Sequence, residues 1–324
     1  MKKVLCIILL LSQSLMGNAQ TSGGQITRKS SSRSNVQSSR KNNSITSVTH
    51  QIVYPQRDEA FNRSDRLQAR GVLNVSYGDN QFFMLPAPDF YGHILERNRS
   101  RKQITLKQAS CKPNAITDDE QWLKENGIQL NSETVGIGMN IGKLALRRRL
   151  KTGGYHVLLL GVSFGDITKV IVTDENETVL YAAYDFENFR KSPKRDKSDD
   201  YSGKQHIFEV VIEGCIMYVG HGGNTYSSTY GNQTGYVTTI DLVNNEILWT
   251  SMPLTNNSGI VLIDNSLITG YGFTDEPDYL LVLDKYSGQR VQKIPLKKAP
   301  GYIITKGSSV LVRTYSYDYV FSIK

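Results

Sequence analysis

The segment Gly136–Lys143 has the glycine-rich composition of a nucleotide-binding loop, but its spacing does not fit one. A dinucleotide-binding fingerprint needs its third glycine at position 141, where the chain has Ile141. A phosphate-binding P-loop needs Ser or Thr at position 144, where it has Leu144. Such loops work only when their backbone N–H groups meet a phosphate. The spacing therefore favours a glycine-containing strand or turn. The basic run Arg147–Arg149 that follows is typical of a solvated turn or strand edge.

The histidines and carboxylates show no local arrangement that predicts catalysis. His221 precedes two glycines and is expected to be a loop histidine, and no His-x-His or His-Glu-x-x-His spacing occurs. No Gly-x-Ser-x-Gly elbow is present either. Paired carboxylates for glycosidic chemistry can lie far apart in a sequence, so a hydrolase stays open as an alternative. The sequence predicts no metal site and no cofactor.

The best candidate for a contact surface is the loop from Gly222 to Gly235. It contains Tyr226 and Tyr230 among Ser, Gly, Thr and Asn residues, with Asn224 and Asn232 as the amide groups. Tyrosine supplies a rigid anchor, and Ser, Gly and Asn supply adaptable polar contacts, which suits a protein or a glycan partner. The alternative is a mobile loop without a partner.

Cys111 and Cys215 are the two cysteines that follow the N-terminal segment. In an oxidising compartment they could form one disulfide. The alternative is a pair of free thiols, because Cys215 lies in an apolar strand where cysteine often packs as a small hydrophobe.

The N-terminus indicates export. Residues 1–19 have the order of a signal peptide, with Lys2 and Lys3 before a short apolar run and Ala19 at the expected cleavage site. Residues 20–50 are Ser- and Asn-rich, basic and free of acidic residues, which predicts a disordered linker. Without the seven positive charges of these two segments the net charge falls from +8 to about +1. The body is nearly neutral, so we expect no nucleic-acid partner. No later segment is apolar enough for a transmembrane anchor, and a periplasmic or secreted location follows.

A hairpin that recurs in the C-terminal half predicts the fold. Tyr236–Ile240 alternates bulky and small residues like a strand, Asp241 begins a turn, and a return strand leads to Trp249. A second copy places Asp284 43 residues after Asp241, with Gly288 where the first copy has Asn245. This spacing is about the length of one four-stranded propeller blade. In an earlier hairpin, Asp185 is expected to take the same place.

The remaining segments fit a propeller-like array of four-stranded antiparallel blades. Residues 51–324 form the predicted domain, with the clearest repeats in 155–324, while 51–154 could be a separate or irregular subdomain. Thr117–Glu120 reads as a capping box for a short helix that ends at Gly127, near residues 117–127. The last strand, Tyr319–Ile323, ends almost at Lys324, so it could complete a blade with N-terminal strands. We expect an all-β fold of about four to six blades.

The repeat at Tyr236–Trp249 resembles the quinoprotein-type (PQQ-like) β-propeller repeat, in which Asp is followed by Gly four positions on and Trp eight positions on. Asp241 and Trp249 match this pattern, and Asp284 and Gly288 match it one repeat later, where Gln292 replaces the Trp. The resemblance implies that the Trp docks between blades. Catalytic members bind the quinone and calcium near adjacent cysteines, a pair that this sequence lacks. The resemblance therefore implies a scaffold and not a quinone enzyme.

These observations predict a non-catalytic, exported scaffold that binds a protein or glycan partner in the cell envelope through its loops. The competing class is an envelope enzyme, either a hydrolase with dispersed carboxylates or a degenerate quinoprotein. The two classes differ in whether a cleft gathers ionisable side chains with perturbed pKa values.

Overall fold

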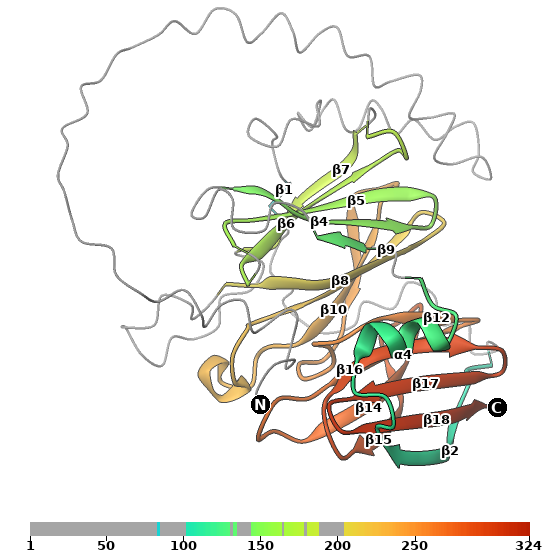
Figure 1. The fold of residues 1–324 in the computed structure, drawn as a ribbon. Helices are drawn as coiled ribbons and strands as arrows, with labels where there is room; N and C mark the ends of the chain where they lie inside the picture. The colour runs from blue at the N-terminus through green and yellow to red at the C-terminus, as the bar shows by residue number, and fades with distance from the viewer. Residues whose placement is uncertain are drawn as a thin grey trace, which may run out of the picture.

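A computed structural model describes the protein at residues 102–129, 132–134, 144–163, 165–177, 180–187 and 204–324, and the backbone of 83–84. Four sheets follow one another along this part of the chain as the blades of a β-propeller, with one short α-helix (Figure 1). The all-β prediction is confirmed, and the four blades lie within the expected range. The predicted signal peptide 1–19, the predicted linker 20–50 and the segment Gly136–Lys143 lie outside the described residues.

The strands of each blade are antiparallel neighbours, and only β1 pairs in parallel, with β7. The first sheet has the order β1 (Phe83–Met84), β7 (Leu180–Asp185), β6 (Ile167–Thr173), β5 (Tyr155–Gly161), β4 (Ala145–Thr152) and β3 (Ser132–Thr134). The second contains β8 (His206–Glu213), β9 (Ile216–Gly222), β10 (Tyr236–Asp241) and β11 (Glu246–Thr250). The third contains β12 (Val261–Ile263), β13 (Ser266–Tyr271), β14 (Asp278–Asp284) and β15 (Arg290–Leu296). The fourth contains β16 (Pro300–Lys306), β17 (Ser309–Thr314), β18 (Tyr317–Ile323) and β2 (Leu106–Pro113).

The 43-residue repeat of the sequence is a repeat of backbone geometry. Asp241 and Asp284 each end the third strand of a blade, and each carboxylate accepts the backbone N–H two residues further on, at 2.7 and 2.9 Å. Asn245 and Gly288, four residues after these aspartates, both have positive φ, at 55° and 68°. This conformation favours Gly and Asn. A strand irregularity also recurs two residues before each aspartate. The predicted turn repeat is confirmed for these two blades.

Asp185 does not occupy the equivalent place in the first blade, so that prediction is wrong. The same strand irregularity occurs there after Val172, which makes Asp174 the counterpart of Asp241. Asp185 instead ends β7, the fourth strand, where it accepts from the Glu187 N–H and from Lys169. The alignment of the repeats missed Asp174 because its turn is one residue shorter than those after Asp241 and Asp284. Positive φ occurs at Glu177, three residues after the aspartate and not four. A long connection between β7 and β8 then hides the regular spacing.

Trp249 joins the second blade to the third. Its side chain is fully buried, and its indole N–H donates to the Lys285 carbonyl at 3.2 Å in the turn of the next blade. A Cβ on Gly288 would meet the indole ring at 2.4 Å, so the glycine also makes room for it. Trp249 thus docks between two blades, as the resemblance to the PQQ-like repeat implies.

The N-terminal strand β2 completes the fourth blade. Its residues 106–113 pair with β18, antiparallel, from Ile323↔Leu106 to Tyr317↔Pro113. This confirms the prediction that the last strand of the chain pairs with an N-terminal strand. Because β2 and β4 are both blade strands, the described parts of residues 51–154 that contain them belong to the propeller. Three apolar clusters join first and second, second and third, and third and fourth blades.

The α-helix of the described segments, α4 (Asp119–Glu125), follows β2 and packs on the fourth blade. Its N-cap is Asp118, whose carboxylate accepts from the Gln121 N–H at 2.7 Å, and not the predicted Thr117. The predicted glycine stop is confirmed, since Gly127 has a φ of 74° and N–H groups of residues 127 and 128 close the helix end. The helix is therefore an addition to the fourth blade.

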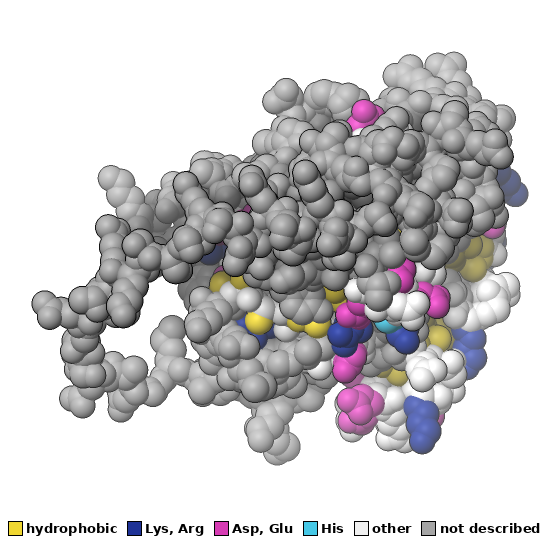
Figure 2. Space-filling model, turned by 90° about the horizontal axis from the view of Figure 1, so that it is seen from above, with side chains coloured by type: hydrophobic (Ala, Val, Ile, Leu, Met, Phe, Trp, Pro, Cys, Tyr) yellow, Lys and Arg dark blue, Asp and Glu magenta, His cyan; other side chains and the backbone are white. Residues whose placement is uncertain are grey.

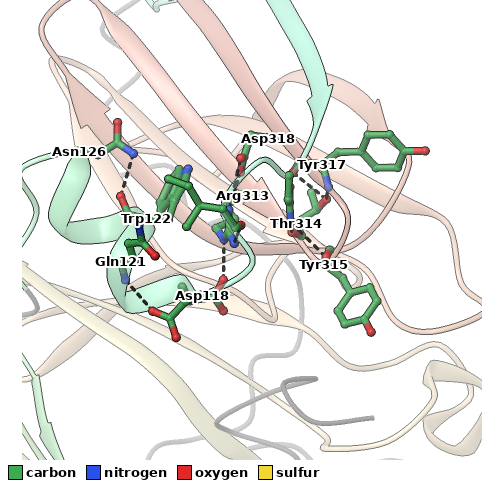
Figure 3. Close-up of polar contacts among 12 residues, drawn as sticks. Asp118, Gln121, Trp122, Asn126, Arg313, Thr314, Tyr315, Tyr317 and Asp318 are labelled. Carbon is green, nitrogen blue, oxygen red and sulfur yellow. Dashed lines mark hydrogen bonds and ion pairs between the residues drawn. The ribbon is translucent and has the colours of Figure 1, made fainter. Parts of the chain in front are cut away.

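The guanidinium of Arg313, at the end of β17, holds α4 in place (Figure 3). It is almost fully buried and donates to Asp119 at 2.5 Å, to Asp318 at 3.0 Å and to the Ile116 carbonyl at 2.6 Å. It also lies 5.3 Å from the ring of Trp122 on the helix. A planar guanidinium suits this arrangement, because its N–H groups bond several acceptors at once.

The basic run Arg147–Arg149 does not form a solvated edge as expected. Arg147 is buried in β4 and donates to the carbonyls of residues 161 and 162, both at 2.9 Å. Arg148 reaches the second blade, where it bonds the Phe208 carbonyl. Arg149 pairs with Glu177 and with Glu133. The run therefore stabilises the first blade and its junction with the second.

Candidate functional site

The connections between strands lie at two opposite edges of the blades, and one edge carries the longer ones. Hydrogen bonds link these longer connections from blade to blade: Asn224 to the Gly165 carbonyl, the Ser227 N–H to Glu276, and Asn257 to the Gly272 carbonyl. We call this side the loop edge. It comprises the connections 162–166, 223–235, 251–260, 272–277, 297–299 and 315–316, together with the described ends 186–187 and 204–205 of the connection between β7 and β8.

The predicted contact loop is held in a defined conformation on the loop edge. A single 3₁₀ turn, η1 (Ser227–Tyr230), lies at its centre. The ring of Tyr226, just before the turn, is 38% exposed and packs edge-on against Phe273 of the third blade, with ring centroids 4.8 Å apart. The Ser227 N–H donates to a Glu276 carboxylate oxygen at 2.5 Å.

Glu276 joins the loop to the third blade. Its second carboxylate oxygen accepts from the Tyr271 hydroxyl at 2.6 Å. Burial, with a further contribution from this carboxylate, raises the pKa of Tyr271, so the hydroxyl remains a donor. Charge-assisted bonds of this kind are stronger than neutral ones. The orientation of Tyr226 is therefore fixed before any partner arrives.

The four residues predicted for the contact loop have different environments. Tyr226 and Asn232 are exposed, and Asn232 accepts from the Ser227 hydroxyl at 3.0 Å. Asn224 is half-buried and bonds the Gly165 carbonyl of the first blade. Tyr230 is fully buried, so its prediction as a surface contact is wrong. Its ring fills the space beside Gly223, where a Cβ would lie 2.0 Å from it.

Two more exposed apolar side chains on the loop edge were not predicted. Met252, 55% exposed, lies in the connection 251–260, and Tyr315, 60% exposed, lies between β17 and β18. The rings of Tyr315 and Tyr317 point away from the Arg313 network in Figure 3. Among the large apolar side chains of the described residues, the exposed ones are these two, Tyr226 and Val291. Three of the four thus lie on one edge. A tyrosine in a two-residue connection was the signal that the sequence offered for Tyr315.

A row of alternating charges lies on the loop edge between the first and second blades. Lys169 pairs with Asp185 at 2.9 Å and with Glu187 at 3.4 Å, and Lys204 pairs with Glu187 at 3.3 Å. Asp166 lies 3.9 Å from Lys204. On the face that Figure 2 draws, acidic and basic side chains of the described residues lie side by side. The opposite charges largely compensate one another.

His206 lies at the end of this row, almost completely buried. Its Nδ1 is 3.5 Å from a carboxylate oxygen of Asp166, and within the described chain neither ring nitrogen makes a hydrogen bond. Burial lowers the pKa of His206 to about 4, although the Asp166 charge acts in the opposite direction. The ring is therefore neutral at pH 7 and closed off from solvent.

His221 lies within strand β9 and not in a loop as expected. Its Nδ1 donates to the side-chain amide oxygen of Gln205 at 3.0 Å, and its Nε2 accepts from the Thr238 hydroxyl at 2.7 Å. Thr238 in turn is bonded to Thr250 at 3.0 Å. Burial lowers the pKa of His221 to about 3, so the ring is neutral. This buried polar chain crosses the second blade and stabilises it.

The described residues contain no group of three or more His, Cys, Asp or Glu side chains that could hold a metal ion. Nor does any helix in the described segments have the length and apolar character needed to cross a membrane. Cys111 and Cys215 are not bonded to each other, so the possible disulfide between them is not formed. Cys111 packs with the third and fourth blades and Cys215 with the first and second, which keeps the thiols in separate clusters.

Comparisons with known proteins find distant likenesses in structure. No family model matches the chain, and no curated protein does. The chain is similar to BamB from Moraxella catarrhalis, with a TM-score of 0.30 and 11% identity over 60% of this chain and 61% of that one. It is also similar to a europium-containing methanol dehydrogenase (TM-score 0.31, 10% identity, 52% and 28% covered).

A third similar structure is that of GH43B from a Bacteroides ovatus xyloglucan locus, with a TM-score of 0.34 and 14% identity over 54% of this chain and 38% of that one. The chain thus spans less than two thirds of the length of each of these structures. At such low identities and TM-scores these likenesses carry no argument about activity or ligand.

Proposed function

We propose that the protein is a non-catalytic, exported scaffold that binds a partner through its loop edge. The observation that supports this most is Tyr226, an exposed aromatic ring whose loop is held by Glu276 and Phe273. An anchor fixed before binding loses little conformational freedom when a partner arrives. Met252 and Tyr315 extend the exposed apolar area on the same edge. The signal-like residues 1–19 support an envelope or secreted location.

We further propose that the scaffold is a propeller of the PQQ-like type. The docked Trp249 and the aspartate turns at residues 241 and 284 support it. We take the chain as a short, scaffold-type relative of such propellers, without a quinone.

The arrangement of His206 also supports a non-catalytic role. The pair of Asp166 and His206 is the arrangement most like a catalytic dyad on the loop edge, yet the His206 residue is only 3% exposed. A catalytic base must come within hydrogen-bonding reach of its substrate. Since this ring is buried, a substrate would not reach it, and we prefer the scaffold to the hydrolase.

Site-specific photo-crosslinking tests the proposed function. A photoreactive phenylalanine analogue replaces Tyr226, Tyr315 or Val291, one at a time, in the protein made by its own cell. Val291 is a matched control, because it is 40% exposed but lies in β15, away from the loop edge. We expect a discrete adduct from positions 226 and 315 and none from 291. The same adducts from all three positions, or no adduct from either tyrosine position, would contradict the proposal.

A further inference from the structure

His206 and Asp166 are buried at the junction of the first and second blades without the hydrogen bonds that buried polar groups normally make. Within the described residues, neither ring nitrogen of His206 has a hydrogen-bond partner, and one carboxylate oxygen of Asp166 has none. The two side chains nevertheless lie only 3.5 Å apart. Native structures leave few buried polar atoms unsatisfied, and each one needs a physical explanation. The junction is therefore imperfectly paired while the imidazole is neutral.

Two links connect this pair to the root of the contact loop, residues 223–235. Strand pairing sets His206 opposite Gly222, which directly precedes the loop. The Gly165 carbonyl, next to the aspartate in the chain, accepts from the Asn224 side-chain amide at 3.3 Å. A displacement of the connection that contains the aspartate therefore moves an anchor of the contact loop.

The charged groups around His206 come from both blades. Those of the loop edge form the row of ion pairs described above: Asp166, Lys169, Asp185, Glu187 and Lys204. On β4, Arg147 donates to the carbonyls of residues 161 and 162, where the connection 162–166 begins. Arg148 pairs with Glu209, on the same strand as the histidine, at 3.7 Å. These groups are engaged with one another, so the ring has a single close charged neighbour, Asp166.

Burial outweighs these charges in setting the protonation of His206. It lowers the pKa to about 4, although the carboxylates at positions 166 and 187 act in the opposite direction. An imidazole in water has a pKa of about 6.5. Between these two values, a state in which water reaches the ring binds a proton that the closed state does not bind. Each pH unit of acidification in this range therefore favours the open state by about tenfold.

We propose that the pair of Asp166 and His206 is an acid-sensitive switch that releases the root of the contact loop. At neutral pH the uncharged ring stays packed, and the bond of Asn224 to the first blade holds the loop. In acid the ring takes up a proton as the connection 162–166 moves away and admits water, since β8 itself stays paired with β9. The consequence for binding rests on the proposed function. A partner held through Tyr226 dissociates in acid, because its anchor is no longer fixed beforehand.

Hydrogen exchange of the full chain at pH 7 and pH 5, corrected for the intrinsic exchange rate, tests the switch. Two amides report the opening: the Asp166 N–H, bonded to the Ser163 carbonyl, and the Gly223 N–H, bonded to the Thr234 hydroxyl. Their protection should fall about 20-fold between pH 7 and pH 5. The Leu242 N–H, bonded to the Cys215 carbonyl at the opposite edge of the second blade, should keep its protection. Unchanged protection at the two reporters, or an equal loss at Leu242, would overturn the proposal.

Two histidine variants assign the response. His206→Gln should abolish the loss of protection at the two reporters, because the titrating group is gone. His156→Gln is the matched control, since His156 lies in the first blade and pairs with Glu177 away from the loop edge. It should keep the response. A response of the same size in His206→Gln would assign the opening to another group and overturn the switch.

The photo-crosslink at position 226 separates the switch from the proposed function. In cell extracts adjusted to pH 7 or pH 5, the adduct should form at pH 7 and fall several-fold at pH 5, and His206→Gln should remove this difference. An adduct that forms equally at both pH values keeps the proposed function and overturns the switch. Acid-dependent exchange without any adduct overturns the proposed function and supports the opening of the junction.

Discussion

Trp249 and Gln292 occupy the same place in successive blades but attach to the next blade by different chemistry. Trp249 faces Thr239 across its hairpin, as Gln292 faces Val282 one repeat later. Trp249 fills an apolar space, whereas the Gln292 amide accepts from the Leu106 N–H at 2.8 Å and donates to the Leu106 carbonyl at 2.9 Å. The docking function of this position is therefore retained when the aromatic ring is lost.

Truncation of these two side chains should cost different amounts of stability. Trp249→Ala should lower the free energy of unfolding by about 3 to 5 kcal/mol, because it leaves a large cavity between blades. Gln292→Ala should lower it by about 1 to 2 kcal/mol, since two backbone groups of the half-buried junction lose their partner. An ordinary surface substitution would be nearly neutral, so the two bonds of Gln292 to Leu106 account for the expected loss. Urea unfolding measures both values, and equal, small losses would contradict an inter-blade role for Trp249.

Gly288 is required both for its backbone conformation and for its lack of a side chain. Gly288→Ala should destabilise the protein more than Gly307→Ala, a matched change at a glycine of similar positive φ, 57°. The Gly307 change should cost about 1 kcal/mol for backbone strain alone, because nothing lies within 4 Å of its added Cβ. At Gly288 the same strain is joined by the collision with Trp249. Thermal unfolding of the two variants measures this difference. Equal losses of stability would show that the contact with Trp249 adds no cost at position 288.

His206 should make stability depend on pH in the acidic range. Its pKa is about 4 in the folded protein and about 6.5 unfolded, so the unfolded state binds the proton first. The free energy of unfolding is therefore not reduced by His206 above pH 6.5. As the pH falls from 6.5 toward 4, protonation of His206 in the unfolded state lowers this free energy by roughly 3 kcal/mol. His206→Gln should flatten this part of the profile, while His156→Gln, at a less buried histidine, keeps it. A profile of the same steepness in the His206 variant would show that other groups govern acid unfolding.

At the scale of single elements, α4 depends on a cap that the sequence pattern placed one residue too early. The capping-box pattern selected Thr117, yet Asp118 makes the bond to the Gln121 N–H. Asp118→Ala should therefore cost about 1 kcal/mol, and Thr117→Ala should be close to neutral. Chemical denaturation measures the stability loss of both variants. A larger loss for Thr117→Ala than for Asp118→Ala would show that Thr117 is the N-cap.

The elements that the sequence predicted are those whose signals are local. Turn chemistry at Asp241 and Asp284, with a positive φ four residues later, is written within five residues of chain. The glycine stop at Gly127 is local in the same way. These features depend on backbone sterics and short-range hydrogen bonds, which a sequence shows directly.

The elements and sites that it missed depend on contacts between distant segments. Arg313 bonds Asp119 across 194 positions of the chain. The same holds for Gln292 and Leu106. No window of sequence contains both partners of such a contact. The burial of Tyr230 beside Gly223 and the exposure of Tyr315 went unpredicted because both depend on the space that neighbouring side chains leave.

For the whole molecule, the pairing of β2 with β18 links a segment near residue 106 to the last residues of the chain. The segment before β2 strengthens this link at the third blade, where Gln103 donates to Asp284 at 2.6 Å and the Ile104 N–H donates to Ser266 at 3.1 Å. Ile104 and Leu106 are buried in the cluster shared by the third and fourth blades. The fourth blade therefore depends on residues 103–113 for its fourth strand and for part of its packing against the third blade.

Removal of residues 102–113 should therefore lower the melting temperature sharply. A chain that lacks residues 20–50 should keep its melting temperature, because that Ser-rich composition cannot support core contacts. Between chains that begin at Lys102 and at Asn114, the melting temperature should fall by roughly 10 °C, since two buried apolar side chains and a full strand pairing are lost. A synthetic peptide of residues 102–113 should restore most of this loss by adding the missing strand to β18. Equal melting temperatures for the two shorter chains would mean that β2 contributes little, and that the fourth blade is stable with three strands.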